Sequence, residues 1–269
     1  MKTASAHPEL LTVVTTIGAL DRRVPCDFEK WRHAKYLLKK RNKLRLGMDV
    51  PSEVSLQRFS DSIDKITSFC AEPSKGIRRS EVLSMGENLR SQTPTVRAID
   101  LFIASMIWGN GLTGYGRYRT CIALNIQRND NSPIELINRA GEEAACGHLE
   151  MAYRSLTNGL WSIGPAFGTK FLYFASPPAS NALIFDGLVA SWKGSELPWT
   201  ADKSTAWTWD WSTYQNYRKW CIDQIQLLID SGHPRVVGTY PLGRPVGPDV
   251  VEAAIFSFQN QNSRPARIK

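Results

Sequence analysis

Apolar residues recur every three or four positions along most of this 269-residue chain, a spacing that predicts helices and at most minor strands. The clearest stretches are Ser55–Phe69, Arg97–Trp108, Pro133–Arg139, Glu142–Asn158, Tyr214–Ser231 and Pro248–Gln259. A polar connector at Glu72–Ser80 contains proline and glycine, which favour a break between elements. We therefore expect an all-α protein with an N-terminal helical region over residues 1–80 and a core over residues 81–269.

One predicted helix is strongly basic. Phe28–Leu46 carries eight lysines and arginines between apolar residues. This pattern is typical of an amphipathic helix with a solvated face, and it also suits a face that contacts phosphates. Both interpretations stay open from the sequence.

The overall composition narrows the class of protein. A chain that is 42% hydrophobic and 22% charged is globular, and a net charge of +8 favours a polyanionic partner. Five cysteines are scattered without metal-ligand or iron–sulfur spacing, so we expect reduced core thiols. Residues 10–20 lack a signal-peptide cleavage pattern, and nothing approaches the length of a membrane span. We expect a cytoplasmic protein.

The stretch that begins at Gly159 carries the first candidate chemistry. Gly164 and Gly168 flank a proline, which predicts a tight turn, and Thr169 is expected to open a buried helix. Backbone N–H groups at such a helix start form a concave site that suits a phosphate. Lys170 falls in the expected first turn, where the helix dipole disfavours a positive charge, so structure alone does not account for it.

A carboxylate follows sixteen positions after Lys170. Asp186 stands between Phe185 and Leu188, where an unpaired charge would be costly. Gly-Pro-Ala-Phe-Gly-Thr-Lys at 164–170 and Ile-Phe-Asp-Gly-Leu-Val at 184–189 together resemble the helix-hairpin-helix and Gly/Pro…Asp motif of base-excision DNA glycosylases, in particular the 8-oxoguanine branch. The resemblance implies that Lys170 is the nucleophile and that Asp186 assists departure of the base.

A glycine-rich run, Leu112–Arg119, follows the helix predicted over 97–108. Gly114 and Gly116 would allow close approach of the backbone to a ligand. Arg117 and Arg119 suit phosphates, and Tyr115 could stack on a base. A glycine-rich turn between two core helices explains the same run.

The resemblance extends from Ile99 to Gln259. The segment 101–110 is similar to a glycosylase helix that ends in asparagines and inserts one into the gap left by the flipped base, which points to Asn110. The segment 252–257 is similar to the C-terminal helix that lines the base pocket. It implies that Phe256 stacks on the base and that Glu252 stands where the family has a glutamine.

These resemblances predict an all-α helix-hairpin-helix DNA glycosylase. It would flip a modified base out of double-stranded DNA, cleave the N-glycosidic bond and cut the strand if β-elimination follows. The resemblance implies no catalytic metal or cofactor and allows a structural monovalent cation at the hairpin. We expect a nucleoid-associated monomer that does not bind membranes. A catalytically inactive DNA-binding module is one alternative, and it does not explain Lys170 together with Asp186. A helical scaffold is another, and it leaves the hairpin unexplained.

The identity of the base depends on Glu252. An ionised glutamate only accepts hydrogen bonds, so its natural partner is an exocyclic amine such as that of cytosine. Bacterial anti-phage relatives of this branch remove glucosylated hydroxymethylcytosine from phage DNA, and we expect that substrate here. Excision of 8-oxoguanine in base-excision repair is the alternative. Glu252 could also face solvent or pair with an arginine, in which case it carries no information about the base.

Overall fold

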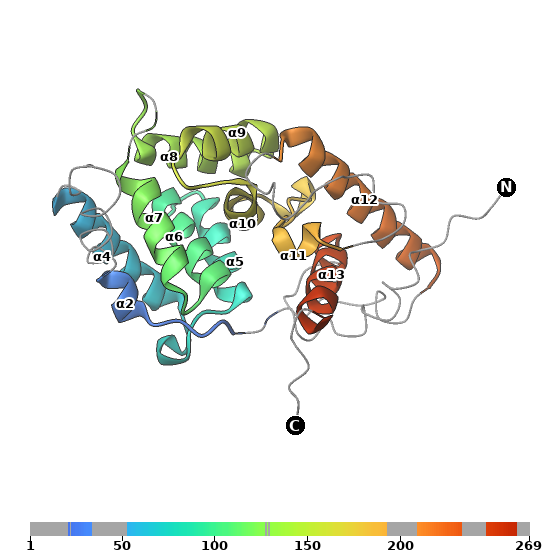
Figure 1. Ribbon diagram of the computed structural model, residues 1–269, viewed down its shortest axis with the longest axis horizontal. Coiled ribbons are helices and arrows are strands. Elements are labelled where there is room, and N and C mark those ends of the chain that lie inside the picture. The colour runs from blue at the N-terminus through green and yellow to red at the C-terminus, as the bar shows by residue number, and fades with distance from the viewer. Residues whose placement is uncertain are drawn as a thin grey trace. The chain divides into compact units, whose positions relative to one another are not determined.

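Helices make up all the regular secondary structure in the part of the chain that the structure describes (Figure 1). The computed structural model describes residues 21, 23–33, 53–126, 128, 130–192, 209–232 and 246–262. Among these residues the β-type pairing is an isolated antiparallel bridge between Val24 and Ile77. The prediction of an all-α fold is confirmed.

The chain separates into two compact units, each with its own helices. The larger unit, residues 23–180, contains α2 (Phe28–Arg32), α4 (Glu53–Phe69), α5 (Arg79–Leu89), α6 (Ala98–Asn110), α7 (Gly114–Asn125), α8 (Pro133–Ala145), α9 (Leu149–Gly159) and α10 (Pro165–Ala175). The described residues from 181 onward contain α11 (Gly187–Ala190), α12 (Trp211–Asp230) and α13 (Asp249–Asn262). None of these described helices is long and apolar enough to cross a membrane.

Helix α6 is the centre of the larger unit, because every residue from Ala98 to Ile107 is buried. Helices α4, α5, α7, α8 and α10 all pack against it. Phe102 of α6 meets Phe171 of α10 edge to face, with 5.9 Å between the ring centres. The apolar run that predicted a helix over 97–108 thus builds the core of this unit.

The helices expected over 55–69, 97–108, 214–231 and 248–259 are present, with ends that differ by a few residues. The boundary between the two helices expected over 133–158 was wrong. Helix α8 continues through Gly141, where a Cβ would come within 2.9 Å of the Ala98 Cβ, so this glycine allows α8 to lie close to α6. The break comes instead at Gly147, which has a φ of 82°.

The basic stretch Phe28–Leu46 is described only as far as His33. Its described part is α2, in which Trp31 is buried and stacks on Phe59 of α4, with 6.4 Å between ring centres. The rest of this stretch, residues 10–20 and the basic tail 264–269 lie outside the described residues. The choice between a solvated face and a phosphate-contacting face therefore stays open.

A fully buried carboxylate joins α6 to α4. Asp100 accepts hydrogen bonds from the Ser62 hydroxyl of α4 at 2.7 Å and from the Arg97 backbone N–H at 2.9 Å. The Arg97 guanidinium also donates to it, at 2.8 Å. These bonds satisfy the carboxylate inside an otherwise apolar interface, so it caps α6 and fixes the position of α4.

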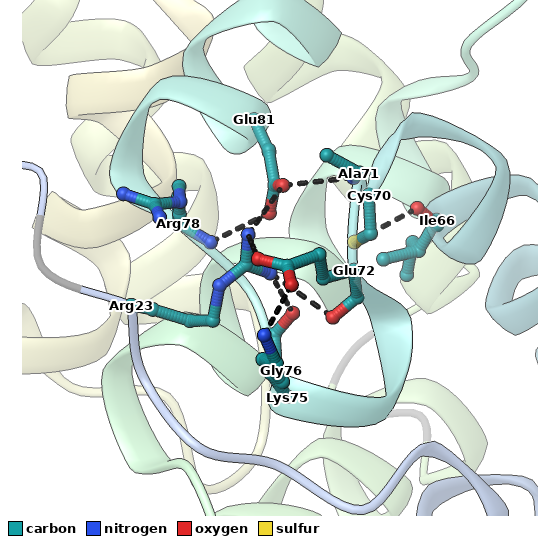
Figure 2. A network of polar contacts seen from close by, with 9 residues as sticks. All are labelled: Arg23, Ile66, Cys70, Ala71, Glu72, Lys75, Gly76, Arg78 and Glu81. Carbon is teal, nitrogen blue, oxygen red and sulfur yellow. Dashed lines mark hydrogen bonds and ion pairs between the residues drawn. The ribbon is translucent and has the colours of Figure 1, made fainter.

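A second buried carboxylate, Glu81, holds the connection between α4 and α5 (Figure 2). It accepts from the backbone N–H groups of Ala71, at 2.9 Å, and Arg78, at 2.7 Å. Arg23 approaches Glu81 at 3.5 Å and donates to the carbonyls of Glu72, at 3.1 Å, and Gly76, at 2.9 Å. The connection around residue 80, where we expected a domain boundary, therefore lies inside the larger unit, and the assignment of 81–269 to a glycosylase core stays a prediction.

All five cysteines are free thiols. Cys26, Cys70, Cys121 and Cys221 are buried, as expected for core thiols, whereas Cys146 is exposed. Burial raises the pKa of the Cys26, Cys70 and Cys121 thiols to about 12. These three groups stay protonated near neutral pH and pack as small apolar side chains.

Replacement of Glu81 tests the Glu81 network. Glu81→Ala leaves two backbone N–H groups and the Arg23 guanidinium without this acceptor, so we expect the free energy of unfolding to fall by about 2–4 kcal/mol. Glu81→Gln keeps one carbonyl oxygen and should lose about half as much. Denaturant titration measures both. The exposed Glu87 of α5 provides the control, since Glu87→Ala should change stability by less than about 0.5 kcal/mol; equal losses at positions 81 and 87 would contradict this role.

Candidate active site

Helices α9 and α10 form a hairpin whose turn contains Gly164. Gly164 is the N-cap of α10 and offers no side chain as a cap, while its carbonyl accepts from the N–H groups of Phe167, at 3.0 Å, and Gly168, at 2.9 Å. Helix α10 begins at Pro165 and not at Thr169, where the sequence was expected to open it. Proline suits this first position because its φ is already helical and it has no N–H to satisfy.

Gly168 and Thr169 therefore lie inside α10, not in the turn. A Cβ on Gly168 would come within 3.3 Å of the Thr157 methyl group of α9, so the glycine permits the two helices of the hairpin to lie close together. Thr169 is buried, and its hydroxyl donates to the Pro165 carbonyl at 2.8 Å. Both residues shape the hairpin from within, and their contact with DNA stays a prediction.

Lys170 is the sixth residue of α10, so the expectation that it lies in the first turn was wrong. It is only 8% exposed, although lysine is among the residue types least often buried. Its Nζ donates to the Ala166 carbonyl at 3.0 Å, which aims the amine back toward the start of the helix. The structure thus holds this lysine in one orientation, close to the hairpin turn.

The methylene groups of Lys170 lie against the end of α6. A Cβ on Gly109 would come within 2.5 Å of the Lys170 Cδ and 2.7 Å of its Cε. Any side chain at position 109 would therefore displace the lysine, a constraint that the sequence did not reveal. Gly109 is exposed, so this contact also marks where the buried stem of Lys170 nears the surface.

Asn110 is the last residue of α6, next to this contact. Its Nδ2 donates to the Met106 carbonyl at 2.8 Å. A Cβ on Gly116 would come within 2.3 Å of the Asn110 Cγ, so the asparagine side chain lies directly on the backbone of α7. Asn110 is thus tied to its own helix and to α7 in this state.

A turn between two core helices was one interpretation of the glycine-rich run 112–119, but from Gly114 onward the run is helix α7. Gly114 and Gly116 lie in its first turn, and Gly116 serves the contact with Asn110. Helix α7 forms despite these glycines because its later residues, Thr120–Leu124, are buried against the rest of the unit.

Arg119 joins α7 to the hairpin. It is 7% exposed, and its guanidinium carbon lies 4.7 Å from the Tyr115 ring centre and 4.9 Å from that of Phe167 in α10. Burial lowers the pKa of this guanidinium from its ordinary value. Tyr115 is 50% exposed at the outer side of this stack, whereas the Arg117 Nε is buried and has no hydrogen-bond partner within the described residues.

A further pair of residues beside the hairpin turn was not predicted from the sequence. Arg128 is exposed and stacks on Trp161, with 5.5 Å between its guanidinium carbon and the ring centre. It also donates to the Thr157 carbonyl of α9 at 3.3 Å. Trp161, in the turn itself, is 44% exposed. The two residues are 33 positions apart in the chain, so no local spacing could have connected them.

Asp186, in the smaller unit, is the N-cap of α11. Its Oδ1 accepts from the N–H groups of Leu188, at 3.0 Å, and Val189, at 3.2 Å. These two hydrogen bonds offset the free-energy cost of placing a carboxylate between apolar neighbours. Asp186 remains half-buried, and neither of the two bonds uses its second oxygen.

Glu252 and Phe256 lie one helical turn apart on α13, so they share a face of that helix. Glu252 is buried, which excludes the solvent-facing alternative. The pKa of Tyr217 in α12 is raised well above its usual range by burial, with smaller contributions from Cys221 and from the charge of Glu252. Glu252 therefore lies near Tyr217 of α12, while Phe256 is partly exposed.

The candidate residues divide between the two units. Lys170, Asn110 and the Arg119 stack gather around the hairpin in the larger unit, whereas Asp186, Glu252 and Phe256 belong to the smaller one. Among the residues that the structure describes, no three His, Cys, Asp or Glu side chains come together as ligands for a metal ion. The larger unit contributes an amine, an amide, a guanidinium and aromatic rings, and the smaller unit contributes two carboxylates and an aromatic ring.

Comparison with known proteins identifies the family. The model of one protein family, described as "Putative 8-oxoguanine DNA glycosylase OGG-like protein", matches residues 49–256, about three quarters of the chain. The match includes every candidate residue named above. No curated protein and no solved structure matched the chain. The resemblance seen in the hairpin and in the Asp186 segment is confirmed, and the chain belongs to the family of 8-oxoguanine DNA glycosylase OGG-like proteins.

Proposed function

We propose that this protein is a DNA glycosylase that removes a modified base from double-stranded DNA and leaves an abasic site. Membership of the family supports this class of reaction. The observation that carries the proposal is the setting of Lys170, a buried amine oriented by the Ala166 carbonyl and packed against Gly109 beside the hairpin. Hydrophobic packing alone gives no reason for a lysine at this position.

In the proposed reaction, Lys170 in its neutral form attacks C1′ of the deoxyribose. A bond forms between the lysine nitrogen and C1′ as the bond from C1′ to the base breaks. The base leaves with the bonding electron pair and takes up a proton. The nitrogen loses a proton and, once the sugar ring opens, holds C1′ as a Schiff base. Water then releases the sugar, or loss of a C2′ proton cleaves the strand by β-elimination.

Asp186 is proposed to stabilise the positive charge that develops on the sugar as the base departs. Its Oδ1 is held by two backbone N–H groups, which fixes the direction of the carboxylate before the reaction begins. A charge that is already oriented stabilises a transition state more than one that must reorganise.

The DNA contacts are proposed to centre on the hairpin. The uncapped start of α10 presents backbone N–H groups suited to a phosphate, and the net charge of +8 attracts the strand. Three residues of α7 are further candidates for contact with DNA, namely Tyr115, Arg117 and Arg119. Asn110 is the candidate to fill the gap left by the flipped base, for which it would have to leave the Met106 carbonyl.

The competing proposal is a DNA-binding module without catalysis. It accounts for the hairpin and the basic charge, but a phosphate-binding hairpin needs neither a buried lysine at position 170 nor a carboxylate at position 186. Those two residues favour the enzyme.

For the base itself, we propose a modified cytosine, specifically the glucosylated hydroxymethylcytosine of phage DNA, whose removal would defend the cell. Support comes from Glu252, a buried carboxylate at the position where the glycosylases that this segment resembles have a glutamine. A carboxylate only accepts hydrogen bonds, and cytosine offers an exocyclic amine. The description of the family favours 8-oxoguanine as the alternative substrate.

Trapping tests the nucleophile. Borohydride reduces a Schiff base to a stable amine, so the wild-type protein should form a covalent adduct with DNA that carries its substrate base. Lys170→Gln should form none and should release no base. The exposed Lys219 of α12 offers a matched control, because Lys219→Gln removes the same charge and should trap normally. Full base release by Lys170→Gln would show that another nucleophile does the chemistry.

Neutralising Asp186 tests the carboxylate. Asp186→Asn keeps the shape and can still cap α11, so binding of modified DNA should survive while the rate of excision drops by about 10²–10⁴-fold. Asp210, the N-cap of α12, is the matched control, and Asp210→Asn should leave the rate unchanged. If Asp186→Asn keeps the wild-type rate, the carboxylate that acts on the sugar lies elsewhere.

Duplexes that differ only in one base test the substrate. We expect release of glucosylated hydroxymethylcytosine to exceed release of 8-oxoguanine and of unmodified cytosine, measured as single-turnover rates. Glu252→Gln restores a group that both donates and accepts, so it should lower release of the modified cytosine by about 10-fold and reduce the preference over 8-oxoguanine. Faster release of 8-oxoguanine by the wild type would overturn the proposed base and leave the glycosylase proposal standing.

A further inference from the structure

The six residues that end at Asp186 form a buried segment without regular secondary structure. Residues 182–185 are all buried, yet they belong to no helix or strand whose regular backbone hydrogen bonds would satisfy them. The segment starts at Asn181, whose φ of 52° is unusual for a residue other than glycine. Buried backbone N–H and C=O groups need partners, so something else must hold this segment.

Helix α12 supplies those partners from one face. The Tyr214 hydroxyl donates to the Leu183 carbonyl at 2.7 Å and accepts from the Leu183 N–H at 3.0 Å. The Tyr217 hydroxyl donates to the Ile184 carbonyl at 3.1 Å. Arg218 Nε donates to the Asn181 carbonyl at 2.9 Å. Positions 214, 217 and 218 are neighbours on a helix surface, so one face of α12 binds the backbone of three residues in this segment.

Aromatic packing fixes the same contact. Phe185 stacks on Tyr217 with 4.6 Å between the ring centres, and Trp209 lies at the same distance from Phe185. Tyr214 and Tyr217 are fully buried. Burial raises the pKa of Tyr214 to about 12 and that of Tyr217 well above its usual range, so both hydroxyls keep their protons and remain donors at neutral pH.

Asp186 follows directly, so its carboxylate is fixed from two sides. Upstream, α12 holds the backbone of residues 181, 183 and 184, and downstream, the N–H groups of Leu188 and Val189 hold Oδ1. We infer that Tyr214, Tyr217 and Arg218 are positioning residues that aim the Asp186 carboxylate through the backbone of residues 181–184. The inference rests on the proposed glycosylase function, since it assigns these residues a part in the step that Asp186 performs.

Two substitutions remove single hydroxyl groups and keep the rings. Tyr217→Phe deletes the bond to Ile184, and Tyr214→Phe deletes both bonds to Leu183. We expect the single-turnover rate of excision to fall on the order of 10-fold for Tyr217→Phe and up to about 100-fold for Tyr214→Phe, because a small misplacement of a reacting group costs rate and not binding. The dissociation constant for modified DNA should stay within about two-fold of the wild type.

The Asp186→Asn background separates positioning from other effects. If the tyrosines act through the Asp186 carboxylate, Tyr217→Phe should cost almost nothing once that carboxylate is gone. Full loss in both backgrounds would overturn the inference. Leu228→Ala controls for stability, because Leu228 is buried on the same helix about three turns beyond Arg218. It should destabilise the unit and keep the excision rate below its melting temperature; equal loss of rate would also overturn the inference.

Hydrogen exchange gives an independent measurement that needs no substrate. The amides of Leu183, Leu188 and Val189 should exchange faster in Tyr214→Phe and Tyr217→Phe than in the wild type, while amides of α9 should not change. Unchanged exchange at these three amides would contradict the inference whatever the enzyme does. Absence of excision by the wild type would instead count against the proposed function.

Discussion

The burial of α6 on all sides is the constraint on which the larger unit depends. Five helices pack around it, which has two consequences. The polar groups of α6 must find hydrogen-bond partners nearby, and the neighbouring helices must be able to approach it closely. Asp100 meets the first demand at the start of the helix. Glycines meet the second, at Gly141 of α8 and at Gly109 near its end. At Gly109 the space of a missing side chain is taken by Lys170, so the packing of the core also determines where the amine lies.

Backbone N–H groups donate hydrogen bonds to three carboxylates, those of Asp100, Glu81 and Asp186. The three differ in how deeply they are buried. Asp100 and Glu81 are buried, and in both cases the two oxygens accept hydrogen bonds from within the larger unit. Asp186 is half-buried, and its two backbone bonds use one oxygen. The same interaction therefore stabilises the fold in two places and orients a half-buried carboxylate in the third. A capping bond suits that purpose, because it fixes direction without neutralising the carboxylate.

Local patterns in the sequence predicted most helices and singled out Lys170 and Asp186. Helical periodicity and the hairpin motif can be recognised in this way because both depend on residues close together in the chain. They failed where a tertiary contact overrides a local preference. The sequence predicted Gly168 in a turn and Gly116 at a close approach to a ligand, yet both lie inside helices and permit contacts between helices. The pairing of Arg128 with Trp161 and of Tyr214 with Leu183 joins residues about 30 positions apart, which no spacing rule connects.

The proposed chemistry asks for an amine and a carboxylate that are both oriented before the base leaves. Lys170 meets this demand inside the larger unit, through Ala166 and Gly109. Asp186 meets it inside the smaller unit, through α11 and α12. Because each group is fixed by contacts within its own unit, neither depends on DNA for its local orientation. Binding energy from DNA is then available for unstacking the base and for bringing the sugar to both groups, which is where a base-flipping enzyme has most need of it.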